Sequence, residues 1–447
     1  MPTYHLGIDD TDSLKMGCTT YIGALLVERL LRHAEFIDYP NLIRLNPNIP
    51  WKSRGNAAVC LRFRIDKGRE ELLGMAAEVV EENRDRQDEK NQPGIALLEG
   101  EVPGRLKLFG KRALYDVLSV EDATGLARDL GVEYRIIRGQ RGLIGALAAI
   151  GNTLEGDHTY ELIVYRREET WGEKRQVDRE SVVEMDRRTF PHTFNNIDHE
   201  TGRILITPHG PDPILFGIRG ESPGVLREAL EMLKFSGGGR WVIYRSNQGT
   251  DAHLMNNPAL AKLAPYQAAV IEGELAAPPK VIRGGHTIAE LTDGKGRIDV
   301  AAYEKSGEIQ RALRGLLPGD RVRVYGGVHV HVHEGQQTRM TFNIEKLEIL
   351  ELVRAAARNP VCGKCEVRMK NKGKNKGYRC EKCGREAKEP ATERLERNVK
   401  EGVYLPPPRS VRHLTKPLQR YGMEKSWSWN SGSIGPFFGL VDPKDPP

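Results

Sequence analysis

The chain opens with Thr3-Tyr4-His5-Leu6-Gly7-Ile8-Asp9-Asp10-Thr11-Asp12, a short mixed apolar run followed by three carboxylates within four positions. A bounded run of this length is typical of a β-strand. Carboxylates at a strand end repel one another unless a cation lies among them, and Mg²⁺ is a cation that prefers oxygen ligands and often brings phosphates. We therefore expect Asp9, Asp10 and Asp12 to form a metal–phosphate site. The alternative is an acidic turn in which Asp12 or Ser13 caps the next helix.

A helix is predicted over residues 20–32, directly after Gly17-Cys18-Thr19-Thr20. Its apolar side chains recur at helical spacing, at Ile22, Leu25, Leu26 and Leu30. Thr19 or Thr20 then lies at a helix N-terminus, where free N–H groups and the helix dipole favour an anion. The same threonines could equally serve as helix caps.

The element order predicts an α+β multidomain fold. Residues 1–130 are interpreted as strand, helix, strand, strand, helix, strand, and residues 131–262 repeat that order. The predicted elements of the second unit are strands at 134–137, 160–165, 214–218 and 241–244 and helices at 143–150 and 223–234. This βαββαβ order is that of a ferredoxin-like domain.

Residues 265–352 carry short strands between Gly and Pro turns, which predicts an OB-fold barrel, a fold that commonly binds single-stranded nucleic acid. Residues 401–447 form a tail rich in Pro and aromatic residues, which we expect to lie over the other domains. Its aromatic side chains are Trp427, Trp429, Phe437 and Phe438.

Four cysteines predict a zinc ribbon within residues 355–400. Cys362 and Cys365 form one Cys-x-x-Cys pair, and Cys380 and Cys383 form a second pair after 14 intervening residues. This spacing supplies four thiolates to a tetrahedral Zn²⁺. The two remaining cysteines do not suggest a disulfide framework, so a reducing compartment is indicated.

The positive charge of the chain is local. Residues 358–400 contain 14 Lys and Arg against 6 Glu, a net +8, whereas the whole chain carries +6. A local basic patch suggests a polyanionic partner. If the hairpin between the cysteine pairs is extended, alternate side chains share one face and form a row of phosphate contacts. These are Arg368, Lys370, Lys372, Lys374 and Lys376. A merely solvated hairpin is the alternative.

Weaker signals lie elsewhere. Gly139-Gln140-Arg141-Gly142-Leu143-Ile144-Gly145 precedes a predicted helix, where Arg141, Gly142 and Gly145 could approach a phosphate, although packing glycines are as consistent. Lys52, Arg54 and Asn56 follow a proline-bounded turn and could contact phosphates or RNA, or could be plain surface.

His329, His331 and His333 alternate with valines, which favours an exposed strand face over a metal triad. No Walker or protein-kinase string occurs.

The length of 447 residues allows about three domains or more. A hydrophobic content of 39% and a charged content of 29% are ordinary for a soluble protein. No apolar run approaches the ~18 residues of a membrane helix, and no leader segment is evident. We expect a cytoplasmic protein with no membrane partner.

The motif Gly-Ile-Asp-Asp-Thr-Asp-Ser with the following Cys-Thr-Thr resembles the start of the archaeal agmatinylcytidine synthetases that modify an isoleucine tRNA, the TiaS family. Further strings resemble the family along nearly the whole chain. They are residues 42–47, 141–151, 246–251 and 413–418.

The resemblance implies an N-terminal kinase-like domain for ATP and the wobble cytidine, and a ferredoxin-like domain second. It implies ATP, agmatine and an isoleucine tRNA with a CAU anticodon as substrates, with agmatine replacing the C2 oxygen of the wobble cytidine. The threonine that becomes phosphorylated in the family corresponds to Thr19. Agmatine is cationic and needs carboxylates, for which Asp212 and Asp251 are candidates.

The chemistry is physically reasonable, because a cytosine carbonyl oxygen is a poor leaving group until it is phosphorylated. Phosphoryl transfer asks the protein mainly for Mg²⁺ and positioning, which the aspartates can supply. Two other functions compete with this one. A non-catalytic single-stranded nucleic-acid-binding protein explains only the last 180 or so residues, and an RNA ligase or nucleotidyl transferase needs a nucleophilic lysine motif that is absent.

Overall fold

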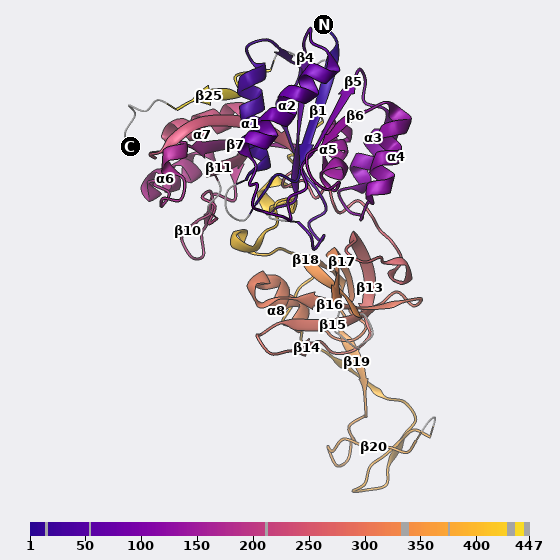
Figure 1. Cartoon of the computed structure of the whole chain (residues 1–447). Coiled ribbons are helices and arrows are strands. Elements are labelled where there is room, and N and C mark those ends of the chain that lie inside the picture. Colours follow the sequence, from indigo (N-terminus) through magenta and orange to yellow (C-terminus); the bar gives the residue numbers. More distant parts are fainter. Residues whose placement is uncertain are drawn as a thin grey trace.

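The computed structural model describes residues 1–13, 17–52, 55–210, 213–331, 339–373, 376–426 and 434–441. A single mixed sheet forms the upper body of the molecule in Figure 1, with strand order β6-β5-β1-β4-β3-β12-β7-β11-β8. The strands of its first half are β1 (Thr3–Asp9), β3 (Asn41–Arg44), β4 (Ala57–Arg64), β5 (Gly94–Glu99) and β6 (Glu133–Ile136), with β2 (Glu35–Phe36) paired to β4. Those of its second half are β7 (Thr159–Arg166), β8 (Thr193–Phe194), β11 (Ile214–Gly220) and β12 (Gly238–Ser246).

Helices cover both faces of this sheet. One face packs against α1 (Thr19–Leu30), α2 (Arg69–Asn83), α6 (Arg179–Thr189) and α7 (Pro223–Met232). The other face packs against α3 (Gly104–Arg112), α4 (Val120–Leu130) and α5 (Gly142–Gly151). Because side chains alternate along a strand, β1 presents Leu6 and Ile8 to the first group of helices and Gly7 and Asp9 to α5.

The predicted boundary at residue 130 does not coincide with a break in the sheet. Strand β6 pairs with β5 and helix α5 packs on β1, so both elements join the half of the sheet built from the first hundred residues. Strand β12 then pairs in parallel with β3 and connects the two halves. The predicted element order of residues 131–262 is present, but order alone does not specify which strands pair. Helix α6 and the strands β8, β9 (Ile197–Asp198) and β10 (Arg203–Ile204) were not anticipated.

A closed barrel follows the sheet. Its strands pair in the order β13-β17-β18-β16-β15, and β15 returns to β13. Their bounds are β13 (Ala268–Leu275), β15 (Thr287–Thr292), β16 (Arg297–Ala302), β17 (Arg321–His331) and β18 (Arg339–Glu351), with α8 (Glu308–Arg314) between β16 and β17 and β14 (Lys280–Val281) paired to β15. The barrel has its own apolar core. In β17, Val328 is buried and His329 is exposed, as the alternation predicted, whereas His333 lies outside the described residues.

A small module hangs from the barrel on a two-stranded stalk of β19 (Ala355–Arg358) and β23 (Ala391–Arg394) (Figure 1). It contains the sheet of β20 (Lys370–Asn371), β21 (Tyr378–Arg379) and β22 (Glu386–Ala387). Strand β24 (Gly402–Tyr404) then pairs with β18 of the barrel.

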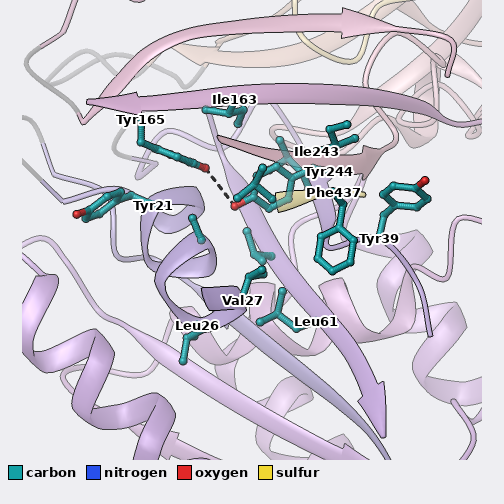
Figure 2. Packing of buried hydrophobic residues seen from close by; sticks show 14 of the residues in the cluster. Tyr21, Leu26, Val27, Tyr39, Leu61, Ile163, Tyr165, Ile243, Tyr244 and Phe437 are labelled. Carbon is teal, nitrogen blue, oxygen red and sulfur yellow. Dashed lines mark hydrogen bonds between the residues drawn. The ribbon is translucent and has the colours of Figure 1, made fainter. Parts of the chain in front are cut away.

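The C-terminal segment, residues 405–426, returns from the barrel to the main sheet. Buried Arg420 contacts Asp157 at 2.9 Å and Glu221 at 2.5 Å. Strand β25 (Phe438–Leu440) pairs with β12, and Phe437 packs beside Tyr39 in the core (Figure 2). Trp427 and Trp429 lie outside the described residues. Within the described part of the chain, no helix is long and apolar enough to span a membrane.

Candidate functional site

The three aspartates lie at the end of β1, next to α1 and α5. Asp9 is the last residue of the strand, and Asp10 has a φ of +58° that turns the chain sharply. The Asp9 carboxylate lies against Gly145 of α5, where a Cβ would overlap it. Gly145 therefore provides space for a carboxylate. Gly142 packs against the backbone of Gln92 and Gly94, which is the packing role that the sequence left open.

Thr19 is the first residue of α1 and is tied to Asp12. The Thr19 N–H donates to Asp12 Oδ1 at 2.7 Å, and the Thr19 hydroxyl donates to the same oxygen at 3.1 Å. The Thr11 hydroxyl in turn donates to Thr19 Oγ1 at 3.0 Å. Asp12 thus caps the start of the helix, as the capping alternative predicted, and its functional role stays a prediction.

The second half of the sheet holds the same helix end in place. The Tyr244 hydroxyl donates to the Thr20 carbonyl oxygen at 2.6 Å, and Tyr165 and Tyr244 share a hydrogen bond of 3.1 Å (Figure 2). Both tyrosines are fully buried. The position of Thr19 is therefore fixed by β1 on one side and by β7 and β12 on the other.

The carboxyl groups of Asp9 and Asp10 are buried and lie close to other carboxyl groups. Burial and the neighbouring Asp10 raise the pKa of Asp9 well above its ordinary value. Burial and Asp12 raise the pKa of Asp10 to about 6, although Arg141, 4.0 Å away, acts in the opposite direction. A divalent cation would remove this penalty, because an opposite charge favours the ionised carboxylates. Carboxylate oxygens are the ligands that Mg²⁺ prefers, but the ligand atoms of Asp9, Asp10 and Asp12 do not gather into a metal-binding cluster in the described part of the chain, so the magnesium site stays a prediction.

A cavity opens beside these carboxylates, and we call it the acidic cavity. It brings together eight of the residues predicted from sequence: Asp9, Asp10, Asp12, Thr19, Lys52, Asn56, Arg141 and Gly145. Its remaining wall is largely apolar, with Leu45, Ile49, Trp51, Val117, Leu118 and Ile144. Lys52 Nζ donates to the carbonyl oxygen of Pro47 at 2.6 Å, which holds its charge at the cavity wall. Arg54 lies outside the described residues.

A second cavity, of about 260 Å³, adjoins the other side of Thr19, and we call it the basic cavity. Asp12, Thr19, Cys18 and Thr20 line it together with Arg44, Glu161, Arg219 and His413. Glu161 pairs with Arg219 at 3.3 Å and with Arg44 at 3.8 Å. Thr20, expected at an anion-binding helix N-terminus, and its neighbour Cys18 therefore face this cavity rather than the acidic one.

Sequence reasoning did not identify four of these residues as site residues. Arg44, Glu161 and Arg219 each stand in a strand among apolar neighbours. A lone charged residue in a buried strand is a usable signal, because burial requires a partner. His413 comes from a different part of the chain and offers no such signal.

Other predicted residues lie elsewhere. The Asp251 carboxylate pairs with Lys346 and accepts from the Lys416 N–H at 2.7 Å, so it joins the sheet body to the barrel and the C-terminal segment. Asp212 lies outside the described residues. Agmatine therefore has no free carboxylate at Asp251 in this structure.

The expected row of phosphate contacts is not one continuous strand. Strand β20 covers only Lys370 and Asn371. Arg368, Lys370 and Lys372 pair with Glu393, Glu381 and Glu386 at 3.3, 2.7 and 2.6 Å. Lys376 is exposed, and Lys374 lies outside the described residues. A glycine-rich turn breaks the alternation, since Gly373 and Gly377 both have positive φ.

The four cysteines of the hanging module converge as predicted. The sulfur atoms of Cys362, Cys365, Cys380 and Cys383 lie within 4.8 Å of one another. Tetrahedral Zn²⁺ with Zn–S bonds of about 2.3 Å requires sulfurs roughly this close. The buried core of the module consists of Met369, Cys362 and Cys380, with Val367, Tyr378 and Ala387 partly buried beside them. With so small a core, a zinc ion held by the four thiolates would contribute much of the stability of the module.

An acid-lined helix N-terminus, a closed barrel and a zinc-ligand module together define a multidomain α+β enzyme that acts on nucleic acid. Family models match three segments, the TiaS TCKD domain over residues 5–77, the TiaS FLD domain over 140–253 and the TiaS C-terminal zinc ribbon domain over 359–399. The chain belongs to the TiaS family, the 2-agmatinylcytidine synthetases of an isoleucine tRNA, because relatives of that name match it along almost its whole length.

The TiaS protein of Methanosarcina mazei is 38% identical over 424 residues, covering 93% of this chain and 97% of the relative. That of Pyrococcus horikoshii is 40% identical over 426 residues, covering 93% and 96%. The crystal structure of a TiaS complex with its isoleucine tRNA and ATP matches with a TM-score of 0.80 at 37% identity, covering 94% of this chain and 98% of the other. A TiaS complex with the same tRNA, AMPCPP and agmatine matches with a TM-score of 0.79 at 35% identity, covering 94% and 98%.

Proposed function

We propose that this chain is an ATP-dependent ligase that joins agmatine to C2 of the wobble cytidine in the CAU anticodon of an isoleucine tRNA. Membership of the TiaS family supports the reaction. The single structural observation that carries the proposal is that Thr19 and Asp12 line both cavities. The Thr19 hydroxyl can therefore accept a phosphoryl group from a nucleotide in one cavity and pass it on to a base in the other.

The acidic cavity is proposed to take ATP. Its carboxylate end suits the phosphates together with Mg²⁺, which Asp9 and Asp10 would hold and which would neutralise charge on the phosphates. Arg141, 4.0 Å from Asp10, adds positive charge at this end, and Lys52 adds positive charge elsewhere in the wall, beside Ile49. Its apolar end, with Leu45, Trp51 and Leu118, suits the adenine ring.

Thr19 is the proposed phosphoryl acceptor. Its oxygen forms the new bond to phosphorus while the bond from phosphorus to the leaving phosphate oxygen breaks, and its proton moves to Asp12 Oδ1, 3.1 Å away. Deprotonation by a positioned carboxylate raises the nucleophilicity of a hydroxyl. The C2 oxygen of the cytidine then takes the phosphoryl group as the bond from Thr19 Oγ1 to phosphorus breaks. The agmatine amine attacks C2 and loses a proton, and the phosphorylated oxygen leaves as inorganic phosphate.

The basic cavity is proposed to take the wobble base. Arg44 and Arg219 supply positive charge where the base becomes phosphorylated. The base must leave its stack to enter a cavity of this size.

The barrel of residues 265–352 is proposed to be an OB-fold and, with the zinc ribbon, to grip the tRNA. Arg368, Lys370, Lys372 and Lys376 are the proposed phosphate contacts of the ribbon. The second half of the sheet is proposed to be the ferredoxin-like unit of the family. Its first two elements, β6 and α5, pack in the first half instead.

The test measures ATP consumption and incorporation of radiolabelled agmatine into an isoleucine tRNA transcript. Turnover that requires ATP, agmatine and tRNA together is the expected result. A matched transcript with uridine at the wobble position is the control and should remain unmodified. A protein that binds the transcript without such turnover would instead be the non-catalytic binder.

A further inference from the structure

The wall of the basic cavity is completed by a residue from the far end of the chain. His413 belongs to the C-terminal segment, yet it lines the cavity with Asp12 and Thr19. The residue keeps exposed surface where it lines the cavity, while its ring lies close to the arginines of the cavity wall. An imidazole that keeps exposed surface in a cavity can offer a ring nitrogen to a bound molecule.

The backbone around His413 is firmly held. The His413 carbonyl oxygen accepts from the Gly249 N–H at 2.8 Å. Arg412 pairs with buried Glu345 of the barrel at 2.8 Å, and the Thr415 hydroxyl donates to the same carboxylate at 3.2 Å. The residues on both sides of His413 are thus tied to the barrel, which fixes the position of the ring.

The neighbours of the ring also determine which nitrogen carries the proton. Arg219 Nη2 lies 2.7 Å from His413 Nδ1. A guanidinium can only donate, so Nδ1 accepts and the proton of the neutral ring lies on Nε2. The charge of Arg44, together with burial and the charge of Arg219, holds the pKa of His413 well below its ordinary value. Among the described residues, none accepts a hydrogen bond from Nε2.

We propose that His413 is a substrate-positioning residue whose Nε2–H donates to a hydrogen-bond acceptor on the base bound in the basic cavity. This inference rests on the proposed function, since the acceptor is the carbonyl oxygen, ring nitrogen or phosphoryl oxygen of the wobble cytidine. Arg219 sets the tautomer and the anchored C-terminal segment sets the direction. A neutral donor suits this place, because the two arginines already supply the positive charge.

Two substitutions separate the two nitrogens of the ring. His413→Gln retains an N–H donor near the position of Nε2, whereas His413→Asn retains an acceptor near Nδ1 and loses the donor. Agmatine incorporation is measured at saturating ATP and agmatine with varied tRNA, and tRNA affinity is measured separately. His33→Asn, at an exposed position just past the end of α1, is the control for a histidine substitution.

His413→Asn should lower kcat roughly tenfold, the loss of one hydrogen bond to the reacting base, with tRNA affinity within about twofold of the unsubstituted protein. His413→Gln should recover most of that loss. The proposal is overturned if His413→Asn retains full kcat, because the Arg219 contact that Asn keeps would then be sufficient. It is also overturned if both variants are equally impaired, because the N–H donor that Gln keeps would then bring no recovery. Absence of turnover in the unsubstituted protein would contradict the proposed function itself, which keeps the two failures distinct.

Discussion

A single oxygen atom, Asp12 Oδ1, accepts both the backbone N–H and the hydroxyl of Thr19. One bond caps the start of helix α1, and the other holds the hydroxyl that we propose as the phosphoryl acceptor. Because both bonds share an acceptor, the loop between the strand and the helix cannot shift without moving the hydroxyl. Stability and reactivity at this site are therefore linked through one carboxylate.

Replacing Asp12 by Asn should separate these two roles. The amide oxygen of Asn can still accept from the Thr19 N–H, so we expect a loss of stability below about 1 kcal/mol. The negative charge and the proton acceptor are lost, and ATP turnover should fall about a hundredfold or more. Steady-state ATP turnover and thermal unfolding measure the two effects. Asp129→Asn on exposed α4 is the control, and unchanged turnover in Asp12→Asn would exclude Asp12 as the proton acceptor.

Gly145→Ala tests the contact between α5 and Asp9. A methyl group at this position would overlap the Asp9 carboxylate, so the carboxylate or the helix must move. We expect a destabilisation of about 1–3 kcal/mol from overpacking and weaker nucleotide binding. Gly74→Ala in α2 meets open space and should be stabilising by roughly 0.5–1 kcal/mol. Equal effects of the two substitutions on nucleotide affinity would refute the role given to Gly145.

Local patterns predicted local structure well. The spacing of the cysteines predicted the cluster of four sulfurs, and the carboxylates of Asp9, Asp10 and Asp12 were expected at a strand end, because both patterns depend on residues close in sequence. The metal–phosphate site itself stays a prediction. The barrel was anticipated from its short strands between Gly and Pro turns.

Properties set by long-range pairing could not be predicted. The sequence does not show that β6 pairs with β5, or that Arg44, Glu161, Arg219 and His413 meet across nearly 370 positions. The glutamates that pair with Arg368, Lys370 and Lys372 lie elsewhere in the module, so a row of free cations was expected. Only tertiary contacts decide these questions, because local propensity carries no information about them.

The zinc ligands give a direct test. Cys380→Ser removes one of four thiolates from a module with little other core, so we expect loss of bound zinc and of protection in residues 359–399. Elemental analysis and hydrogen exchange measure the two effects. Lys382→Ala, on the same turn, should keep one zinc per chain. Full zinc content in Cys380→Ser would mean that these cysteines are not its ligands.

The ion pairs of the ribbon predict that two of its glutamates weaken tRNA binding. If Lys370 and Lys372 contact tRNA phosphates, Glu381 and Glu386 compete for them. Glu381→Gln with Glu386→Gln should then tighten tRNA binding, and Lys370→Ala with Lys372→Ala should weaken it and flatten the log–log salt slope by up to about two units. Salt titrations of tRNA affinity test both. An unchanged slope in the lysine variant would show that the hairpin is only solvated.

Glu345 predicts a pH dependence at the junction of the barrel and the C-terminal segment. Burial alone would raise its pKa, but Arg412 and His253 outweigh burial and lower the pKa to about 2. A carboxyl with a depressed folded pKa contributes stability above its unfolded pKa of about 4.3, and that stability is lost as the pH falls towards 2.

The contribution at neutral pH is on the order of 3 kcal/mol. We therefore expect Glu345→Gln to be destabilising at pH 7, with the difference from the unsubstituted protein shrinking between about pH 4.3 and pH 2. Urea unfolding at a series of pH values measures this difference. Glu351→Gln, a mostly exposed glutamate on the same strand, should leave stability nearly unchanged at every pH. A Glu345→Gln difference that stays constant down to about pH 2 would mean that Arg412 and His253 do not hold the carboxylate in its charged form.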